Sequence, residues 1–360
     1  MNASSIRTVA MTLLLVASSG CDQSPPPAGF AGLGGQPGDF AQVSPGKVFQ
    51  FPADHGAHPD FRIEWWYLTA NLEDDQGQRF GVQWTLFRSA LAPGSREPGW
   101  GNRNLWIGHA GLTSKTGHYS AQTLARGGIG QAGVDVTPFN AWIDDWHLRS
   151  QPGAEHALAA MSVQARGPQF AYQLALTSTR PLVLQGEQGY SRKSDAGQAS
   201  YYYSQPFFTA AGQLQIEGKH YQVKGRAWLD REWSSQPLAA DQSGWDWFSL
   251  HLDDGQQLMV FRLRGAGGQH FLSGNWIDSQ GRSTPLAPGS ISLRPLQDTR
   301  VAGRQIPTRW AIDIPSHALH VETTALNPKA WMAVGTPYWE GPVTLAGSHG
   351  GEGYLEMTGY

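Results

Sequence analysis

From residue 51 onward, large hydrophobic residues recur at every second position along many short segments. Residues 80–86 (FGVQWTL) alternate large apolar and small or polar side chains, a pattern that predicts a half-buried strand. Residues 223–229 and 258–264 are strand-like too, and turn-forming sequences such as 74–77 (DDQG) separate segments of this kind. Helical periodicity is faint. Short strands joined by tight turns predict an all-β protein with little helix, either a sandwich or an up-and-down barrel.

An internal repeat divides the predicted strands into two sets. Residues 64–67 (EWWY) open one strand pair and residues 245–248 (WDWF) open another. Aligning Trp66 with Trp247 gives an offset of 181 residues, about half of the 360-residue chain. A repeat of this length indicates duplicated domains rather than a solenoid. We expect the boundary between residues 232 and 244, with one domain over residues 51–235 and the other over residues 236–360.

Composition supports folded domains and excludes some partners. The chain is 40% hydrophobic and 15% charged, and it contains 15 Trp, 11 Tyr and 14 Phe. Such a chain can bury a core, unlike a disordered one. The formal net charge is −3 and no basic tract is present, so we expect no binding to nucleic acid.

The N-terminal residues predict secretion and a lipid anchor. Residues 9–17 (VAMTLLLVA) are too short to span a bilayer but suit the core of a signal peptide, and Ser18-Ser19-Gly20 leads into Cys21, the single cysteine. We therefore expect a signal peptide over 1–21, acylation of Cys21, and a Pro/Gly-rich tether over 22–50. The protein would then be extracytoplasmic and membrane-anchored, on a membrane that the sequence does not specify. The alternative is an ordinary signal peptide with an incidental cysteine.

Three ordered motifs carry a resemblance to a known family. They are residues 61–67 (FRIEWWY), 225–233 (GRAWLDREW) and 353–360 (GYLEMTGY), and together they resemble the AttH/carotenoid 1,2-hydratase superfamily over about residues 50–360. The resemblance implies two consecutive lipocalin-like antiparallel β-barrels. It also implies genes beside ABC-transporter permeases, which makes such a permease a candidate partner.

One predicted strand face carries an unusual combination of carboxyl, cationic and indole side chains. Trp228, Asp230 and Glu232 alternate along residues 223–232, together with Lys224 and Arg226, and so share one face. On a solvent-facing strand this would be an ordinary charged surface with one misplaced Trp. In a barrel lumen the carboxyl groups would need partners and would have perturbed pKa values.

The hydratase resemblance gives that face a role. Hydration of an isolated alkene needs a carboxylic acid that donates a proton, with aromatic rings near the resulting cation. The resemblance places this acid at Asp230 beside Trp228, and we add Glu232 as a further catalytic candidate. The hydratase also carries a His-x-Trp pair, whereas the comparable residues here are 201–203 (YYY), a departure that puts carotenoid hydration in doubt.

Aromatic residues supply the candidate ligand-binding set, which is Tyr201, Tyr203, Trp66, Trp84 and Trp247. We expect no cofactor and no metal, since His55 and His58 lack a clear third ligand. Three hypotheses follow from the sequence. The protein is a lipoprotein that holds a hydrophobic small molecule, or a hydratase or isomerase on an unsaturated or terpenoid substrate, or an interaction module whose barrels are filled by their own side chains.

Overall fold

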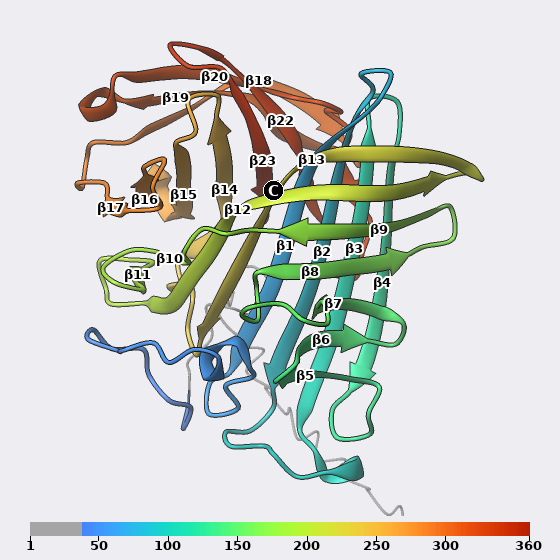
Figure 1. Ribbon diagram of the computed structural model, residues 1–360. Coiled ribbons are helices and arrows are strands. Elements are labelled where there is room, and N and C mark those ends of the chain that lie inside the picture. Colours follow the sequence, from blue (N-terminus) through green and yellow to red (C-terminus); the bar gives the residue numbers. More distant parts are fainter. Residues whose placement is uncertain (1–37) are drawn as a thin grey trace, which may run out of the picture.

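The computed structural model describes residues 38–360, and these form two curled antiparallel sheets that follow one another along the chain (Figure 1). Helix within this range is limited to three-residue 3-10 turns, and no helix there is long and apolar enough to cross a membrane. The predicted all-β fold with two tandem lipocalin-like barrels is confirmed. The short turns are η2 (Ala53–His55), η3 (Gly99–Gly101), η4 (Ala266–Gly268) and η5 (Pro315–His317).

The first sheet has 13 strands, and its order is β4-β3-β2-β1-β13-β12-β9-β8-β7-β6-β5, with β10 and β11 paired to β12. The long strands β1, β2, β12 and β13 form its centre. Its strands are β1 (Ile63–Asp74), β2 (Arg79–Ala90), β3 (Asn104–Ser114), β4 (His118–Arg126), β5 (Ala132–Val136), β6 (Phe139–Ile143), β7 (Trp146–Ser150), β8 (Ala160–Arg166), β9 (Phe170–Thr177), β10 (Val183–Leu184), β11 (Tyr190–Arg192), β12 (Ala199–Ile216) and β13 (Lys219–Ser234).

The second sheet has 10 strands in the order β17-β16-β15-β14-β23-β22-β20-β19-β18, with β21 paired to β22. It begins after a connection over residues 235–241. Its strands are β14 (Gln242–Leu252), β15 (Gln257–Gly265), β16 (His270–Ile277), β17 (Ser283–Pro285), β18 (Ser292–Val301), β19 (Arg304–Ile314), β20 (Leu319–Ala325), β21 (Trp331–Met332), β22 (Tyr338–Gly347) and β23 (Gly351–Met357).

The outer face of β1–β3 packs against β22 and β23, so the two barrels share a wall-to-wall interface. Asn71 Nδ2 donates to the Gly353 carbonyl at 2.8 Å, and Nδ1 of His109 lies 3.1 Å from the Tyr338 hydroxyl. The approach is close at Gly81, where an added Cβ would lie 2.5 Å from Cγ of Pro342. This glycine lets the two sheets touch where any larger residue would separate them.

Three apolar clusters account for the core. One fills the first barrel around Trp66 and Trp84, and one fills the second around Phe248 and Trp310. The third lies between the barrels and includes Tyr202, Trp228, Trp247, Phe261 and Tyr354. The interface is therefore a hydrophobic core in its own right.

A buried ion cluster and the N-terminal segment close one end of the first barrel. Glu64 accepts from both Arg88 and Arg231, and the Arg231 guanidinium lies 3.8 Å from the ring centre of Trp66. Burial acts to raise the pKa of Glu64, but the two guanidinium groups outweigh it and hold that pKa well below its usual value. His58 stacks on Trp233 with ring centres 3.9 Å apart and also contacts Glu64. The charged groups here are thus compensated by one another inside an apolar barrel, although Nε of Arg231 and Nε1 of Trp233 have no hydrogen-bond partner among the described residues.

Candidate functional site

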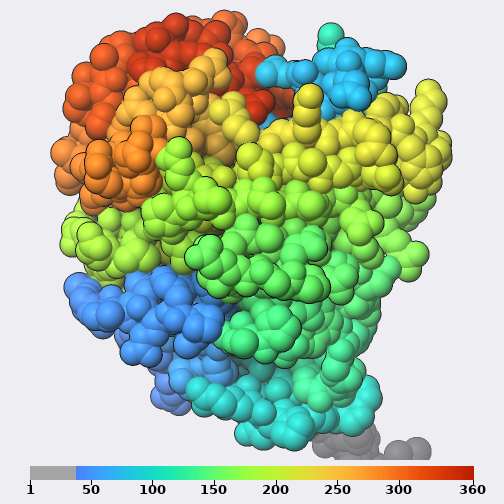
Figure 2. Space-filling view, in the orientation of Figure 1, coloured from blue at the N-terminus to red at the C-terminus, as the bar shows by residue number. Residues whose placement is uncertain are grey.

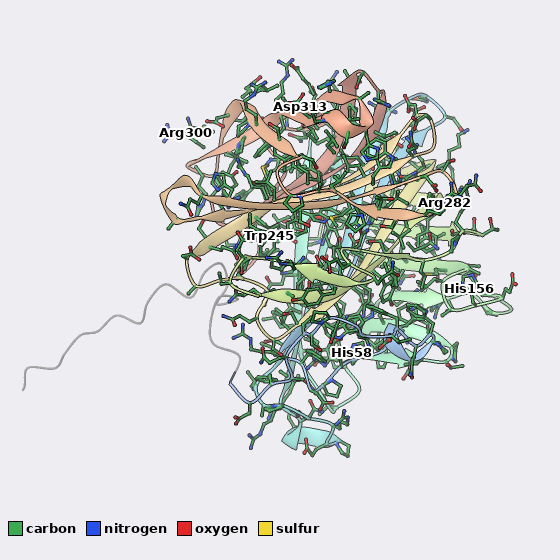
Figure 3. All side chains as sticks on the ribbon, turned by 90° about the vertical axis from the view of Figure 1, so that its left-hand side faces the viewer. His58, His156, Trp245, Arg282, Arg300 and Asp313 are labelled. Atoms are coloured by element: carbon green, nitrogen blue, oxygen red, sulfur yellow. The ribbon has the colours of Figure 1, made fainter. Side chains whose placement is uncertain are left out.

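An apolar cavity of about 100 Å³ lies between the barrels. Strands β1, β2, β12 and β13 contribute one side, and β14, β15 and β23 contribute the other. Trp245, which lies between the two sheets in Figure 3, belongs to its wall. The lining residues are Ile63, Trp65, Tyr67, Phe87, Lys193, Tyr202, Asp230, Glu232, Pro237, Leu238, Trp245, Trp247, Phe261, Leu263 and Glu356.

Each barrel contributes the same three-residue row to this cavity. In the first barrel Trp65 is paired with Phe87 on β2 and with Glu232 on β13. In the second barrel Trp247 is paired with Phe261 on β15 and with Glu356 on β23. All six side chains line the cavity. The duplication therefore builds one site from two equivalent Phe–Trp–Glu rows.

This pairing corrects the alignment of the repeat. The strand register makes Trp247 the counterpart of Trp65, an offset of 182, and not of Trp66 as the sequence pattern suggested. Successive residues of a strand point to opposite faces, so a shift of one residue exchanges the cavity face for the barrel interior. Trp66 accordingly lies in the first barrel's core, 1% exposed.

Asp230 is a carboxylic acid held in an apolar wall. It is 3% exposed, and its Oδ1 accepts hydrogen bonds from the Ser204 hydroxyl and, at 2.8 Å, from Nε1 of Trp228. Burial raises its pKa to about 7; the hydrogen bonds from Ser204, Trp228 and Tyr202 oppose this rise and the charge of Glu232 adds to it. Both protonation states of Asp230 are therefore accessible near neutral pH.

Glu356, from the second barrel, is the other acid in the cavity wall. Its Oε1 accepts a 2.6 Å hydrogen bond from Nε1 of Trp245. Burial raises its pKa to about 7; hydrogen bonds from Trp245 and Tyr67 lower it and the charge of Glu232 raises it. Tyr67 also donates to Glu340, a buried residue on β22 whose pKa is raised well above its usual value, mainly by burial and then by the charge of Glu356.

The carboxylate of Glu232 lies close enough to both acids for its charge to raise their pKa values. Its Oε1 lies 2.7 Å from Nζ of Lys193 and accepts from the Ser200 hydroxyl. The Lys193 ammonium in turn lies 4.4 Å from the ring centre of Phe261. The cavity thus combines one ion pair, two acids with pKa values near 7, and aromatic walls, an arrangement suited to proton transfer onto a hydrophobic molecule.

The other candidate residues are distributed as follows. Trp228 is buried behind Asp230 and orients it. Tyr201 and Tyr203 point to the opposite face from Tyr202 and contact the N-terminal segment, where their hydroxyls meet Ser44 and His55. Trp66 and Trp84 belong to the first barrel's interior cluster. Of the expected aromatic set, only Trp247 lines this cavity; Cys21 lies outside the described residues.

Several cavity residues were not expected. They come from four different strands or loops, and no local motif joins them. These residues are Glu356, Tyr67, Lys193 and Tyr202. A sequence signal existed for Glu356, since it belongs to the 353–360 motif. Within residues 38–360 no group of three His, Cys, Asp or Glu side chains is arranged to hold a metal ion.

The sequence profile of the AttH-like family matches residues 42–360. The chain belongs to this family. An AttH protein from Nitrosomonas europaea is 34% identical with a TM-score of 0.78, and the match covers 89% of this chain and 100% of that one. Among curated proteins none matches in sequence.

Two more solved structures resemble this AttH-like protein in fold. Kievitone hydratase from Nectria haematococca is 13% identical with a TM-score of 0.67, and CghA, solved with Sch210972, is 15% identical with a TM-score of 0.52. Each match covers 89% of this chain and 96% of the other. At these identities the likeness establishes the shared two-barrel fold.

Proposed function

We propose that this AttH-like protein is a hydratase-type enzyme that adds water to a hydrophobic, unsaturated small molecule held between its barrels. One observation carries the proposal: Asp230 and Glu356, one from each barrel, both have pKa values raised to about 7 and both line one apolar cavity. Acids and bases work best when their pKa lies near the working pH. The fold it shares with kievitone hydratase is consistent with this reaction class.

The proposed reaction transfers two protons, one from Asp230 and one to Glu356. Asp230, in its acid form, donates a proton to one alkene carbon and leaves a cation on the other. Ser204 and Trp228 both donate to Oδ1 of Asp230, and we assign the transferred proton to the other oxygen, Oδ2. Water then attacks the cation, and Glu356, in its carboxylate form, accepts the proton that the water loses. One water is consumed. Proton exchange with solvent then returns Asp230 to its acid form and Glu356 to its carboxylate form.

The cavity walls suit the cation. Indole and phenyl faces attract positive charge, and Trp65, Trp247, Phe87 and Phe261 line the same space. The negative charge of Glu232 lies close by, compensated by Lys193. The apolar walls also limit the access of bulk water. The water that attacks the cation is therefore the one that gives up its proton to Glu356.

The test is conversion of isoprenoid and other hydrophobic alkenes in water enriched in oxygen-18, followed by mass spectrometry. We expect a product that gains one labelled water with wild-type protein. Asp230→Asn and Glu356→Gln should each slow this conversion by about 100-fold or more, and Glu322→Gln on an exposed strand of the second barrel is the matched control. Conversion that survives both cavity substitutions would overturn the assignment.

The apolar walls also support a second candidate, a carrier that holds a hydrophobic molecule without changing it. Native mass spectrometry of protein purified from its own host would reveal a co-purifying lipid or isoprenoid. Recovery of the unmodified molecule by wild type and by both carboxyl variants, with no turnover by any of them, would favour the carrier.

We further propose that acylated Cys21 anchors the protein on the outer side of a membrane, where an ABC-transporter permease would be a partner. Metabolic labelling with a radioactive fatty acid tests the anchor. Wild type should take up label, and Cys21→Ser should not. Retention of label by the serine variant would exclude this anchor, and crosslinking in the host would test the permease.

A further inference from the structure

An apolar band crosses the outer face of the first sheet, from the cavity to the sheet edge. The strand register aligns Trp65 of β1 with Phe87 of β2, Phe87 with Ile107 of β3, and Ile107 with Leu124 of β4. Residues paired in this way lie on one face of a sheet. Trp65 and Phe87 line the cavity, whereas Leu124 is 54% exposed. The band therefore joins the cavity to the surface.

At the sheet edge the band meets most of the exposed large hydrophobic side chains of the described residues. A hydrogen bond from Gly99 N to Gly128 O at 2.6 Å brings the β2–β3 and β4–β5 loops together. These loops form the lower end of the first barrel in Figures 1 and 2. We call this surface the apolar end; its residues are Leu91 (73% exposed), Trp100 (70%), Leu105 (39%), Leu124 (54%) and Ile129 (38%).

Arginine side chains and the exposed carboxylates of Glu97 and Asp144 lie together around the apolar end. The Arg126 guanidinium lies 6.0 Å from the Trp100 ring centre and donates to the Trp100 carbonyl at 2.6 Å. Arg103 is exposed in the same loop, and Arg96 pairs with Asp60 at 3.0 Å. Exposed aliphatic side chains next to Trp and Arg suit the interface of a bilayer, where the rings lie at headgroup level and guanidinium groups meet phosphates.

The first described residues of the chain lie near the same end of the barrel. Ala41 N donates to Asp60 O at 2.9 Å, and Gly94 N, in the loop of the apolar end, donates to Pro59 O at 3.0 Å. The described chain thus starts close to the apolar end. Residues 22–37 separate it from Cys21, and a segment of that length can reach about 50 Å when extended.

We propose that the apolar end docks on a lipid bilayer, and that the apolar band conducts a hydrophobic substrate from the acyl chains to the cavity. The docking does not depend on any catalytic activity. The conduction step rests on the proposed function. A bilayer is the occupant that fits because the surface is apolar at its centre, carries Trp100 beside Arg126 at its rim and is adjacent to the start of the described chain.

A site-specific probe tests the docking in the full chain carrying Cys21→Ser. Leu124→Cys and, as the control, Arg300→Cys are labelled with bimane; Arg300 is exposed on the second barrel, far from the apolar end (Figure 3). Vesicles of phosphatidylethanolamine and phosphatidylglycerol with brominated acyl chains should quench the label at position 124 and not at 300. Equal quenching at both positions, or at neither, would overturn the proposal.

A second measurement separates the bilayer from other occupants. Leu105→Glu combined with Leu124→Glu should weaken vesicle binding about ten-fold or more, because two exposed apolar groups are lost, whereas Arg300→Gln should not. Arg300→Gln should also leave turnover of a substrate supplied in free solution unchanged. Wild-type turnover of that free substrate reports the chemistry and vesicle binding reports the docking, so failed docking and failed chemistry remain distinguishable.

Two results would assign the apolar end to another occupant. If the wild-type chain dimerises and the double substitution dissociates the dimer without affecting vesicle binding, the surface is a contact between copies. If iodide in solution cannot quench bimane at position 124 in the absence of vesicles, another part of the chain covers the surface. Either result would contradict docking on a bilayer.

Discussion

Trp65 and Trp247 occupy equivalent positions in the two barrels and line the same cavity. Each is flanked in register by a Phe on one neighbouring strand and a Glu on the other. The duplication thus supplied both walls of one site, while later differences at other positions gave the two walls different chemistry. At the position of Asp230 in the first barrel, the second barrel has Tyr354, which lies in the core between the sheets.

The pH dependence of turnover follows from the two raised pKa values. Asp230 must be protonated, so activity should fall as pH rises through about 7, and Glu356 must be ionised, so activity should fall as pH drops through about 7. We expect a bell-shaped profile of kcat/KM centred near neutral pH. Glu356→Gln should lower kcat by about 100-fold or more and remove the acid limb, whereas Asp230→Asn should remove the alkaline limb. A flat profile between pH 5 and 9 would contradict both roles.

The same shift predicts how stability depends on pH. The pKa of Asp230 is about 7 in the folded protein against 3.8 for an unperturbed side chain. Below pH 4 both states bind the proton and the group has no effect. Between about 4 and 7 only the folded state retains it, so the free energy of unfolding falls as pH rises. Asp230→Asn should therefore be more stable than wild type at pH 8 and similar at pH 4, as measured by urea unfolding. Asp313→Asn, on a half-buried surface position, is the control.

Gly81 should be sensitive to a single methyl group. Its Cβ would lie 2.5 Å from Pro342 Cγ and 2.7 Å from the Tyr354 hydroxyl, so Gly81→Ala must push the barrels apart or distort β2. We expect a loss of about 1–3 kcal/mol in the free energy of unfolding. Gly101→Ala, where an added Cβ meets nothing within 4 Å, is the control. Equal unfolding midpoints for the two variants would show that the interface is not close-packed at this point.

Glu64 should be essential to the closed end of the first barrel. Glu64→Gln leaves Arg88 and Arg231 buried without their shared carboxylate, which should cost about 3–5 kcal/mol. Glu322→Gln removes the partner of Arg309 in a half-exposed pair and should cost at most about 1 kcal/mol. Chemical denaturation of both variants checks the contrast. A small effect at Glu64 would mean that water reaches the cluster.

The fold was accessible from the sequence because period-two alternation and turn residues are local signals. The resemblance to the AttH family was accessible for a related reason, since its motifs are short and ordered. The candidate site was accessible only in part. Asp230 and Glu232 share a strand face with Trp228, and that alternation could be read directly; Glu356 lies in another strand of another barrel, and only the pairing of Trp247 with Glu356 brings it to the cavity.

The sequence by itself determined the all-β fold and the face that carries Asp230, because each depends on residues close together in the chain. It also indicated the duplication, because each copy repeats the same local pattern, but it left the alignment of the copies one residue out. Tertiary structure decided the rest. It placed the cavity between the barrels rather than within them, and it turned Tyr202 toward the cavity while Tyr201 and Tyr203 point away. The physical reason is register: hydrogen bonding between distant strands fixes which face of a strand meets which partner, and a shift of one residue reverses the outcome.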